Sequence, residues 1–102
     1  YIMALSSTYY GQSVTKFAIA SETKDWGSVS DGDEAAEEVT VTGAQLGDFA
    51  LASMSIDTTD ITLTATVTAA DTVTVILANN TGGAIDLGSG TLYVMVMPRE
   101  VI

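Results

Sequence analysis

The chain has no cysteine and no histidine among its 102 residues. The first absence excludes disulfide frameworks and thiolate metal sites. The second excludes a Ser-His-Asp triad, histidine-ligated zinc and the one side chain that normally titrates near neutral pH. Basic residues are scarce too: the chain has three, Lys16, Lys24 and Arg99, against thirteen acidic residues. Its net charge is −10. Nucleic-acid binding rests on cations placed against phosphates, and an anionic membrane would repel this chain, so we expect neither partner. The charge most simply favours solubility at high local concentration.

Long apolar runs are also missing. No stretch approaches the roughly 18 apolar residues that a membrane-spanning helix requires. The amino terminus, Tyr1–Ser6, has no basic lead and no long apolar run, so it does not read as a signal peptide. We therefore expect a protein made and used without Sec export. Met3 followed by Ala4 is a candidate for the true start, in which case Tyr1 and Ile2 come from an upstream start or from added residues.

No window of ten or more residues shows the 3.6-residue apolar period of a helix, whereas strand patterns recur. Residues 61–69 alternate strictly: Ile61, Leu63, Ala65 and Val67 face one way and four threonines face the other, so this strand should have one solvated face. Val39 and Val41 belong to a strand that Gly43 ends. Residues 48–56 are apolar on both faces at first, which is typical of an interior strand.

Residues 70–97 hold two runs rich in Val, Leu, Ile and Thr around a loop of Asn, Gly and Asp, a pattern that predicts two antiparallel strands and their connection. A tight hairpin at 69–71 leads into the first run, 72–78. The second run, 91–97, reads as a central strand that Pro98 ends, because proline lacks the N–H that a ladder needs. Residues 13–19 predict a short strand with Phe17 and Ile19 buried, while 21–33 and 34–38 read as loop.

Together these patterns predict one all-β domain, a small antiparallel β-sandwich or jelly-roll-like domain with an extended N-terminal segment. We place the sandwich core at residues 38–102. Residues 1–37 are expected to form an arm and an acidic loop that contact a binding partner or a neighbouring subunit. A chain of this length buries only roughly 60–70% of its unfolded surface. Oligomerisation is therefore expected.

The acidic run at 31–38 is the best metal candidate, because calcium takes six to eight closely spaced oxygen ligands. It begins with Asp31-Gly32-Asp33 but lacks the spaced glycine and terminal glutamate of an EF-hand loop. A solvated acidic loop is the favoured interpretation, so we expect no metal and no other cofactor.

Catalytic constellations are equally weak. Asp57 and Asp60 could act as the paired carboxylates of a glycosidase, but they bracket a Thr-Thr turn, where aspartate commonly bonds nearby backbone amides. The glycine-rich stretch at 82–90 lacks a phosphate-loop lysine. Asn79-Asn80-Thr81 matches a glycosylation sequon, and residues 80–83 read as a turn with left-handed backbone positions. We expect no enzyme, and a small hydrolase that uses acidic residues is the weakest alternative.

Aromatic residues gather in the first third of the chain, and aromatics are favoured anchors of protein interfaces. Tyr9 and Tyr10 sit side by side and would face opposite ways if extended, so one of them is hard to bury within a single sheet. With Phe17 and Trp26 they form the candidate interface set, although all four are equally ordinary core residues for a small domain.

Two phrases resemble a module of tailed-bacteriophage virion proteins: V-T-G-A-Q-L-G-D-F-A at 41–50 and A-A-D-T-V-T-V-I-L-A-N-N-T-G-G-A-I-D-L-G-S-G-T-L-Y-V at 69–94. The module recurs in small head decoration, or cement, proteins and in related domains of head fibres. The resemblance covers residues 38–97 and leaves the amino-terminal part unmatched.

The resemblance implies a non-enzymatic structural protein on the outer surface of the capsid, assembled in the host cytoplasm. It would bind the major capsid protein, typically as a homotrimer, and stabilise the shell by bridging neighbouring subunits. The alternative is a fibre or spike domain that binds a host-surface receptor through an exposed aromatic platform, with Trp26 or Tyr93 as candidates. Copy number discriminates the two, since hundreds per particle favour decoration.

Overall fold

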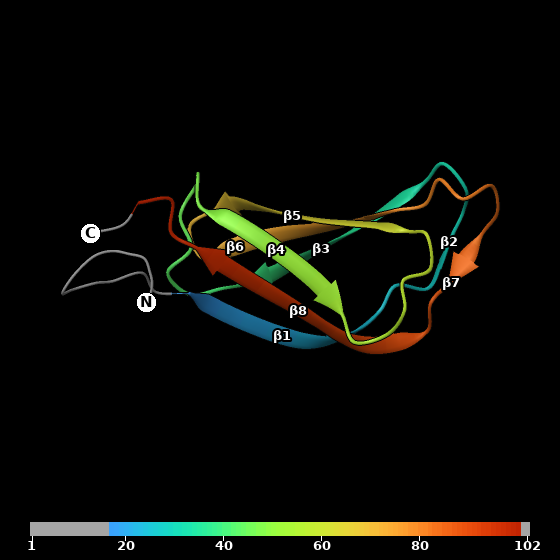
Figure 1. Cartoon of the computed structure of the whole chain (residues 1–102), viewed down its shortest axis with the longest axis horizontal. Coiled ribbons are helices and arrows are strands. Elements are labelled where there is room, and N and C mark those ends of the chain that lie inside the picture. The colour runs from blue at the N-terminus through green and yellow to red at the C-terminus, as the bar shows by residue number, and fades with distance from the viewer. Residues whose placement is uncertain (1–16, 101–102) are drawn as a thin grey trace.

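The computed structural model describes residues 17–100, and every regular element in that range is a β-strand. The strands are β1 (Ala18–Asp25), β2 (Ser28–Val29), β3 (Glu34–Thr40), β4 (Phe49–Met54), β5 (Thr62–Ala69), β6 (Thr72–Ala78), β7 (Ile85–Asp86) and β8 (Ser89–Met97). They form two three-stranded antiparallel sheets, β1-β8-β4 and β3-β6-β5, and a small sheet of β2 and β7. The two larger sheets are the layers of a β-sandwich, and β2 and β7 lie at one end of it (Figure 1). The predicted fold class is confirmed.

The core lies between the two central strands. β6 contributes Val73, Val75 and Leu77, and β8 contributes Leu92, Val94 and Val96, all at most 2% exposed. Burying such a side chain contributes roughly 1.5–3 kcal/mol relative to leaving it in water. The edge strands β1 and β4 turn alanines inward, and these pack against the core with partial burial: Ala18, Ala20, Ala50 and Ala52. Large branched residues therefore fill the centre of the sandwich and small residues its margins.

Several expected elements agree with the structure. In β5 the threonines are exposed, while Ile61 just before the strand and Val67 within it are buried. The β5–β6 hairpin turns at Ala70 and Asp71, and Asp71 has a φ of 61°, the left-handed value that tight hairpin turns use. β8 is the central strand of its sheet and ends one residue before Pro98.

The amino-terminal half departs from expectation. The strand predicted at 13–19 begins, within the described residues, at Ala18 and continues to Asp25, so much of the expected loop at 21–33 is strand. Its orientation is opposite to the prediction, because Ala18 and Ala20 face the core while Phe17 and Ile19 are 56% and 71% exposed. Alternation shows that a strand has two faces, but it does not say which one the neighbouring sheet covers.

Residues 34–38, expected as loop, are the first part of β3. Five residues with three glutamates carry little strand signal, and the strand forms because β6 supplies a full ladder of backbone partners. β1 and β3 thus belong to opposite sheets of the sandwich, and residue 37, the expected end of the arm and acidic loop, lies within β3.

The strand order contradicts two further expectations. Residues 48–56 contain β4, which is an edge strand rather than an interior one. The runs at 72–78 and 91–97 are central strands of different sheets, so they are not partners of each other. Their connection crosses between the layers and contains β7, which pairs with β2. Composition identified these strands, but strand order depends on pairings far apart in the sequence.

Candidate functional site

The outer face of the β1-β8-β4 sheet carries the largest group of exposed hydrophobic side chains on the described chain. Phe17, Ile19, Phe49, Leu51 and Tyr93 are between 44% and 71% exposed. Met95 and Met97 of β8 lie on the same outer side of the sheet as Tyr93 and are half-buried. We call these seven residues the apolar face. None of them is charged.

Strand register brings the seven residues together. Ile19 of β1 pairs with Met95 of β8, and Met95 pairs with Leu51 of β4, so the three form a row across the sheet. Met97 pairs with Phe49 in the neighbouring row. Side chains of alternate residues point to the same side of a sheet, so adjacent rows are continuous.

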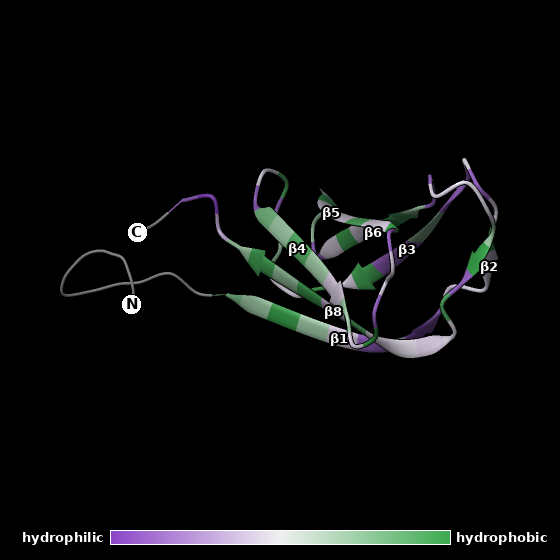
Figure 2. Cartoon of the chain, turned by 45° about the vertical axis from the view of Figure 1, so that its right-hand side comes forward, coloured by the Kyte–Doolittle hydropathy of each residue, from purple (hydrophilic) through white to green (hydrophobic). Residues whose placement is uncertain are grey.

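The apolar character is confined to one end of the sheet. Tyr93 is flanked in register by Ser21 and Ser53, and the next outward row pairs Thr23 with Thr91. Figure 2 shows the same gradient along β1, whose hydrophobic half lies nearer the amino-terminal end of the trace. The apolar face therefore begins where the chain enters β1.

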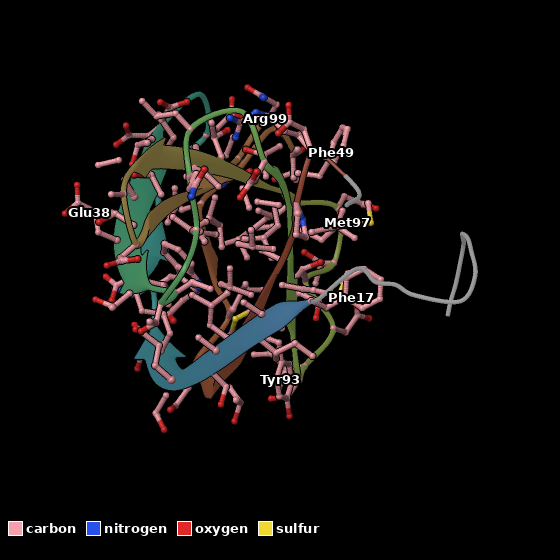
Figure 3. All side chains as sticks on the ribbon, turned by 90° about the vertical axis from the view of Figure 1, so that its left-hand side faces the viewer. Phe17, Glu38, Phe49, Tyr93, Met97 and Arg99 are labelled. Atoms are coloured by element: carbon pink, nitrogen blue, oxygen red, sulfur yellow. The ribbon has the colours of Figure 1, made fainter. Side chains whose placement is uncertain are left out.

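The opposite outer face, on the β3-β6-β5 sheet, is polar. Exposed residues there include Glu34 and Glu38 of β3 and the four threonines of β5. Figure 3 shows Phe17, Phe49, Tyr93 and Met97 on one side of the molecule and Glu38 on the other. This contrast makes the apolar face the candidate interaction surface of the described residues.

A hollow of about 350 Å³ adjoins the apolar face at the start of β1. Its lining includes Phe17, Thr42, Gly43, Val96 and Pro98. Gly43 has a φ of 94°, a conformation that side-chain-bearing residues rarely adopt. The hollow is mixed in character, because the acidic Asp48 lines it together with these apolar residues.

Asp48 directly precedes Phe49, the first residue of β4, and its carboxylate is held by several hydrogen bonds. Its carboxylate accepts hydrogen bonds from the backbone N–H groups of Arg99 (3.1 Å) and Gln45 (3.1 Å), and the Arg99 guanidinium lies 3.2 Å away. The bond from the Arg99 backbone, then that from Gln45 and the Arg99 charge, lower the pKa of Asp48. Arg99 also donates to the Leu46 carbonyl at 2.9 Å, so it ties the chain after β8 to the loop before β4.

A charged bridge joins β1 and β3, the edge strands of opposite sheets. Lys24 Nζ lies 2.9 Å from Glu37 Oε1 and 4.9 Å from the centre of the Trp26 ring. A hydrogen bond between the carboxyl groups of Glu22 and Glu37 raises the pKa of Glu22 and lowers that of Glu37, and Lys24 adds to the second shift.

The acidic loop shows local hydrogen bonding by its carboxylates. Asp31 accepts from the backbone N–H of Gly82 at 2.9 Å, and Asp33 accepts from that of Glu34 at 2.9 Å. Within residues 17–100, no group of three or more carboxylates is placed to hold a metal ion. Asp57 likewise caps its own turn by accepting from Thr59 N–H at 2.8 Å. Asp57 and Asp60 thus lie in a turn, as the Thr-Thr spacing indicated.

Asn79 is a buried polar residue whose structural role sequence reasoning missed. Its side chain is fully buried and its amide donates to the carbonyls of Val29 and Gly83, both at 2.8 Å. Its carbonyl oxygen accepts from Thr81 N–H (3.0 Å) and Thr81 Oγ1 (2.7 Å). The first asparagine of the sequon thus connects several backbone segments through its side chain. The run Asn-Asn-Thr-Gly-Gly was the sequence signal for this arrangement. The turn at 80–83 is present, with a φ of 100° at Gly82.

The predicted interface residues fall in different places. Tyr9 and Tyr10 lie outside the described residues. Phe17 is exposed and belongs to the apolar face. Trp26 is only 8% exposed and packs in the core, so it does not offer the exposed platform that was expected of it, whereas Tyr93 is 44% exposed. Sequence reasoning missed Ile19, Phe49 and Leu51, because apolar residues on a strand were assigned to the core.

Among residues 17–100, no helix is long and apolar enough to cross a bilayer. Comparison with protein-family models, curated proteins and solved structures found no match to the chain.

Proposed function

We propose that this chain is a non-enzymatic structural protein of a tailed-bacteriophage particle. It binds the outer surface of the head as an oligomer and stabilises the shell by bridging major capsid proteins. The observation that carries the proposal is the apolar face, an uncharged surface on a chain of net charge −10. The resemblance of residues 41–50 and 69–94 to head decoration modules supplies the identity of the partner.

The two outer faces suit a protein held between a shell and solvent. The apolar face turns toward the partner, where exclusion of water from Phe49, Leu51 and Ile19 provides the driving force. The acidic and threonine-rich face turns outward and keeps decorated particles apart by charge repulsion. A stable contact buries roughly 800 Å² on each partner, so the rim around the apolar face also takes part.

Oligomerisation belongs to the same proposal. Three copies around a three-fold axis of the shell would each present an apolar face and would stabilise one another by mass action on assembly. The site of action is then the outer surface of the virion, and assembly takes place in the host cytoplasm. Neither nucleic acid nor membrane is a partner in this proposal.

Decoration of expanded heads that lack the protein tests the proposal. Leu51→Asp places a charge in the apolar face, and we expect it to weaken head binding at least tenfold, roughly 1.4 kcal/mol or more. Thr64→Asp is the matched control on the outer face of the opposite sheet, and it should bind within about twofold of the wild type. Occupancy is measured by quantitative electrophoresis of purified heads, with circular dichroism to verify folding of both variants.

Electron microscopy of the purified particle supplies the second readout. The expected map shows the protein as a lattice of hundreds of copies on the shell. A map with a few tens of copies at a tail or vertex would replace decoration with the fibre alternative. Full occupancy of the heads by Leu51→Asp would contradict the proposal that the apolar face is the binding surface.

A further inference from the structure

The two edges of the β1-β8-β4 sheet differ in chemistry. β1 carries Glu22, Lys24 and Asp25, and β3, the edge strand that a salt bridge joins to β1, carries three glutamates. β4 (Phe49–Met54) has no charged residue, no proline and no shift of register in its ladder with β8. Edge strands of soluble proteins are normally blunted by charge, proline or bulges, because an unpaired edge accepts a further strand. β4 lacks these devices.

The edge strand β5 lies against β4 on the same flank of the sandwich (Figure 1). β5 is also uncharged, but its ladder with β6 shifts register between Val67 and Ala69. Such an irregularity turns an edge away from further pairing. Among the four edge strands of the described sandwich, β4 is therefore the one that is open to another strand.

Backbone groups of β4 point alternately toward β8 and toward the open edge. The Ser55 N–H donates to the Thr91 carbonyl at 2.9 Å, and this register makes the odd-numbered residues of β4 the hydrogen-bonded partners of β8. The N–H and C=O groups of Ala50, Ala52 and Met54 therefore point away from β8. Within residues 17–100, no other strand or loop forms a backbone hydrogen bond with these outward groups. They are available to pair with an added strand.

A second copy of β4 fits this edge. When Ala52 lies opposite Ala52 of the second copy, Ala50 lies opposite Met54, so every outward residue of both strands is paired about a two-fold axis. Each hydrogen-bonded pair exchanges two bonds, which gives a total of about six. On the outer side of the sheet, the two Leu51 side chains become diagonal neighbours, within reach of each other. The edge is thus complementary to itself in hydrogen bonding and in apolar contact.

Charge near β4 does not oppose this contact. Asp48, the acidic residue directly before β4, is paired with Arg99, and Arg99 packs against Gly47. The same register brings Asp57 of the second copy opposite Gly47, so this carboxylate approaches an ion pair and not an unpaired acid. The charged strands β1 and β3 form the far flank of the sandwich. Repulsion from more distant charges is screened over about 8 Å at physiological ionic strength.

We propose that two copies of this chain associate by antiparallel pairing of their β4 strands, which joins their β1-β8-β4 sheets into one continuous sheet. The two-fold axis is normal to this sheet, so the two apolar faces lie side by side on the same outer surface. The pairing uses only this chain, so it goes beyond the proposed function and does not rest on it. A two-fold contact closes after two copies, and it is therefore additional to the three-fold contacts of the proposed assembly.

Sedimentation equilibrium of the full-length protein at physiological ionic strength tests the association. We expect a reversible dimer, and Ser53→Glu should raise its dissociation constant at least about tenfold, because it places two carboxylates diagonally across the contact. Ser21→Glu is the matched control, since Ser21 and Ser53 flank Tyr93 on the same outer face, on β1 and β4 respectively. It should stay within about twofold of the wild type. A monomeric wild type, or equal effects of the two variants, would overturn the proposal.

Amide hydrogen exchange locates the contact. The N–H groups of Ala50, Ala52 and Met54 become hydrogen-bonded in the dimer, so their exchange should slow at least about tenfold as the protein concentration rises through the dissociation constant. Tyr93 bonds to β4, so Ser21 and Thr23 direct their N–H groups to the open edge of β1, and their exchange should not change. A dimer without slowed exchange in β4 would overturn the proposal, because it would indicate contact through the apolar faces.

A proline substitution separates pairing between copies from pairing with the shell. Ala52→Pro removes an outward N–H and no bond to β8, and proline is tolerated at such edge positions. We expect this variant to be a folded monomer by circular dichroism and sedimentation, whereas Ser21→Pro, on the open edge of β1, should dimerise like the wild type. If the wild type is monomeric and Ala52→Pro alone loses head binding, β4 pairs with a strand of the shell, and the proposal is overturned. Failure of the wild type to decorate heads leaves the dimer unaffected.

Discussion

Asn79 shows how much one buried polar side chain can organise. An amide group has two N–H donors and a carbonyl with two lone pairs, and all four are used here by Val29, Gly83 and Thr81. Its backbone adds bonds to Gly32 (2.7 Å) and Asp33 (3.0 Å). The residue therefore links the chain before β3 to the loop after β6.

Replacing Asn79 should be costly. We expect Asn79→Ala to lower the free energy of unfolding by about 3 kcal/mol, because it leaves the buried Val29 carbonyl without this partner and removes the bonds to Gly83 and Thr81. Urea denaturation followed by circular dichroism measures the loss. Asn80→Ala, at the exposed neighbouring position, should change it by less than about 0.5 kcal/mol. Equal effects of the two variants would show that the amide network contributes little.

At the scale of elements, β1 and β3 are joined by side chains rather than by a backbone ladder. Lys24 lies between the Trp26 ring and Glu37, and a hydrogen bond between the Glu37 and Glu22 carboxyl groups shifts the pKa of both. These groups are partly solvated, so their charges are screened and the bridge contributes modestly. Its pH dependence is nevertheless distinctive, because the two carboxyl groups shift in opposite directions.

The folded-state pKa of Glu22 is raised, so its contribution to stability is fully present below the unfolded pKa and is lost as the pH rises through the folded value. The pKa of Glu37 is lowered, so its contribution is present above the unfolded pKa and is lost as the pH falls through the folded value. The pair therefore stabilises the fold most between these two folded pKa values, where it holds one proton.

Carbon-13 NMR titration of the side-chain carboxyl groups checks the pair. In Glu37→Gln, the pKa of Glu22 should fall, because the amide of glutamine donates a hydrogen bond to the Glu22 carboxylate. Glu38→Gln, one residue along β3 on the outer face, is the control and should leave Glu22 unchanged. An unaltered Glu22 titration in Glu37→Gln would rule out the hydrogen bond with Glu37 as the cause of the raised pKa of Glu22.

For the whole molecule, charge is the dominant surface property. All thirteen acidic residues lie in residues 17–100, where Lys24 and Arg99 are the bases. Both of these bases take part in ion pairs. The remaining carboxylates repel one another through solvent, and this repulsion opposes the compact state. The apolar face is the exception on this surface, which is why it is the candidate binding surface.

Salt should therefore stabilise the fold. Raising NaCl from 10 to 150 mM shortens the Debye length from about 30 to about 8 Å, and we expect a rise in Tm of about 3 °C as repulsion is screened. Differential scanning calorimetry measures the change. Calcium chloride at equal ionic strength is the control for the acidic loop at 31–38. A markedly larger rise with calcium would show that the loop binds the cation and is not merely solvated.

Sequence reasoning identified the strands whose pattern is local. β5 was predicted from strict alternation, and β8 from an apolar run ended by Pro98, because side-chain period and proline chemistry act within a few residues. The end of β3 at Val39 was predicted, but its first five residues were missed, since three glutamates among them mask a strand that is held by its neighbour β6. The apolar face was missed for a related reason: Ile19 and Leu51 look like core residues until the sheet that covers their opposite side is known.

By itself, the sequence determined the all-β class, the tight turn before β6 and the acidic, cysteine-free and histidine-free chemistry of the chain. These follow from residue type and short-range spacing. Only the tertiary structure decided which face of each strand is inside, because a strand has two faces and burial depends on the sheet packed against it. That decision turned Phe17 and Ile19 outward and Trp26 inward. It thereby placed the candidate binding surface on the β1-β8-β4 sheet.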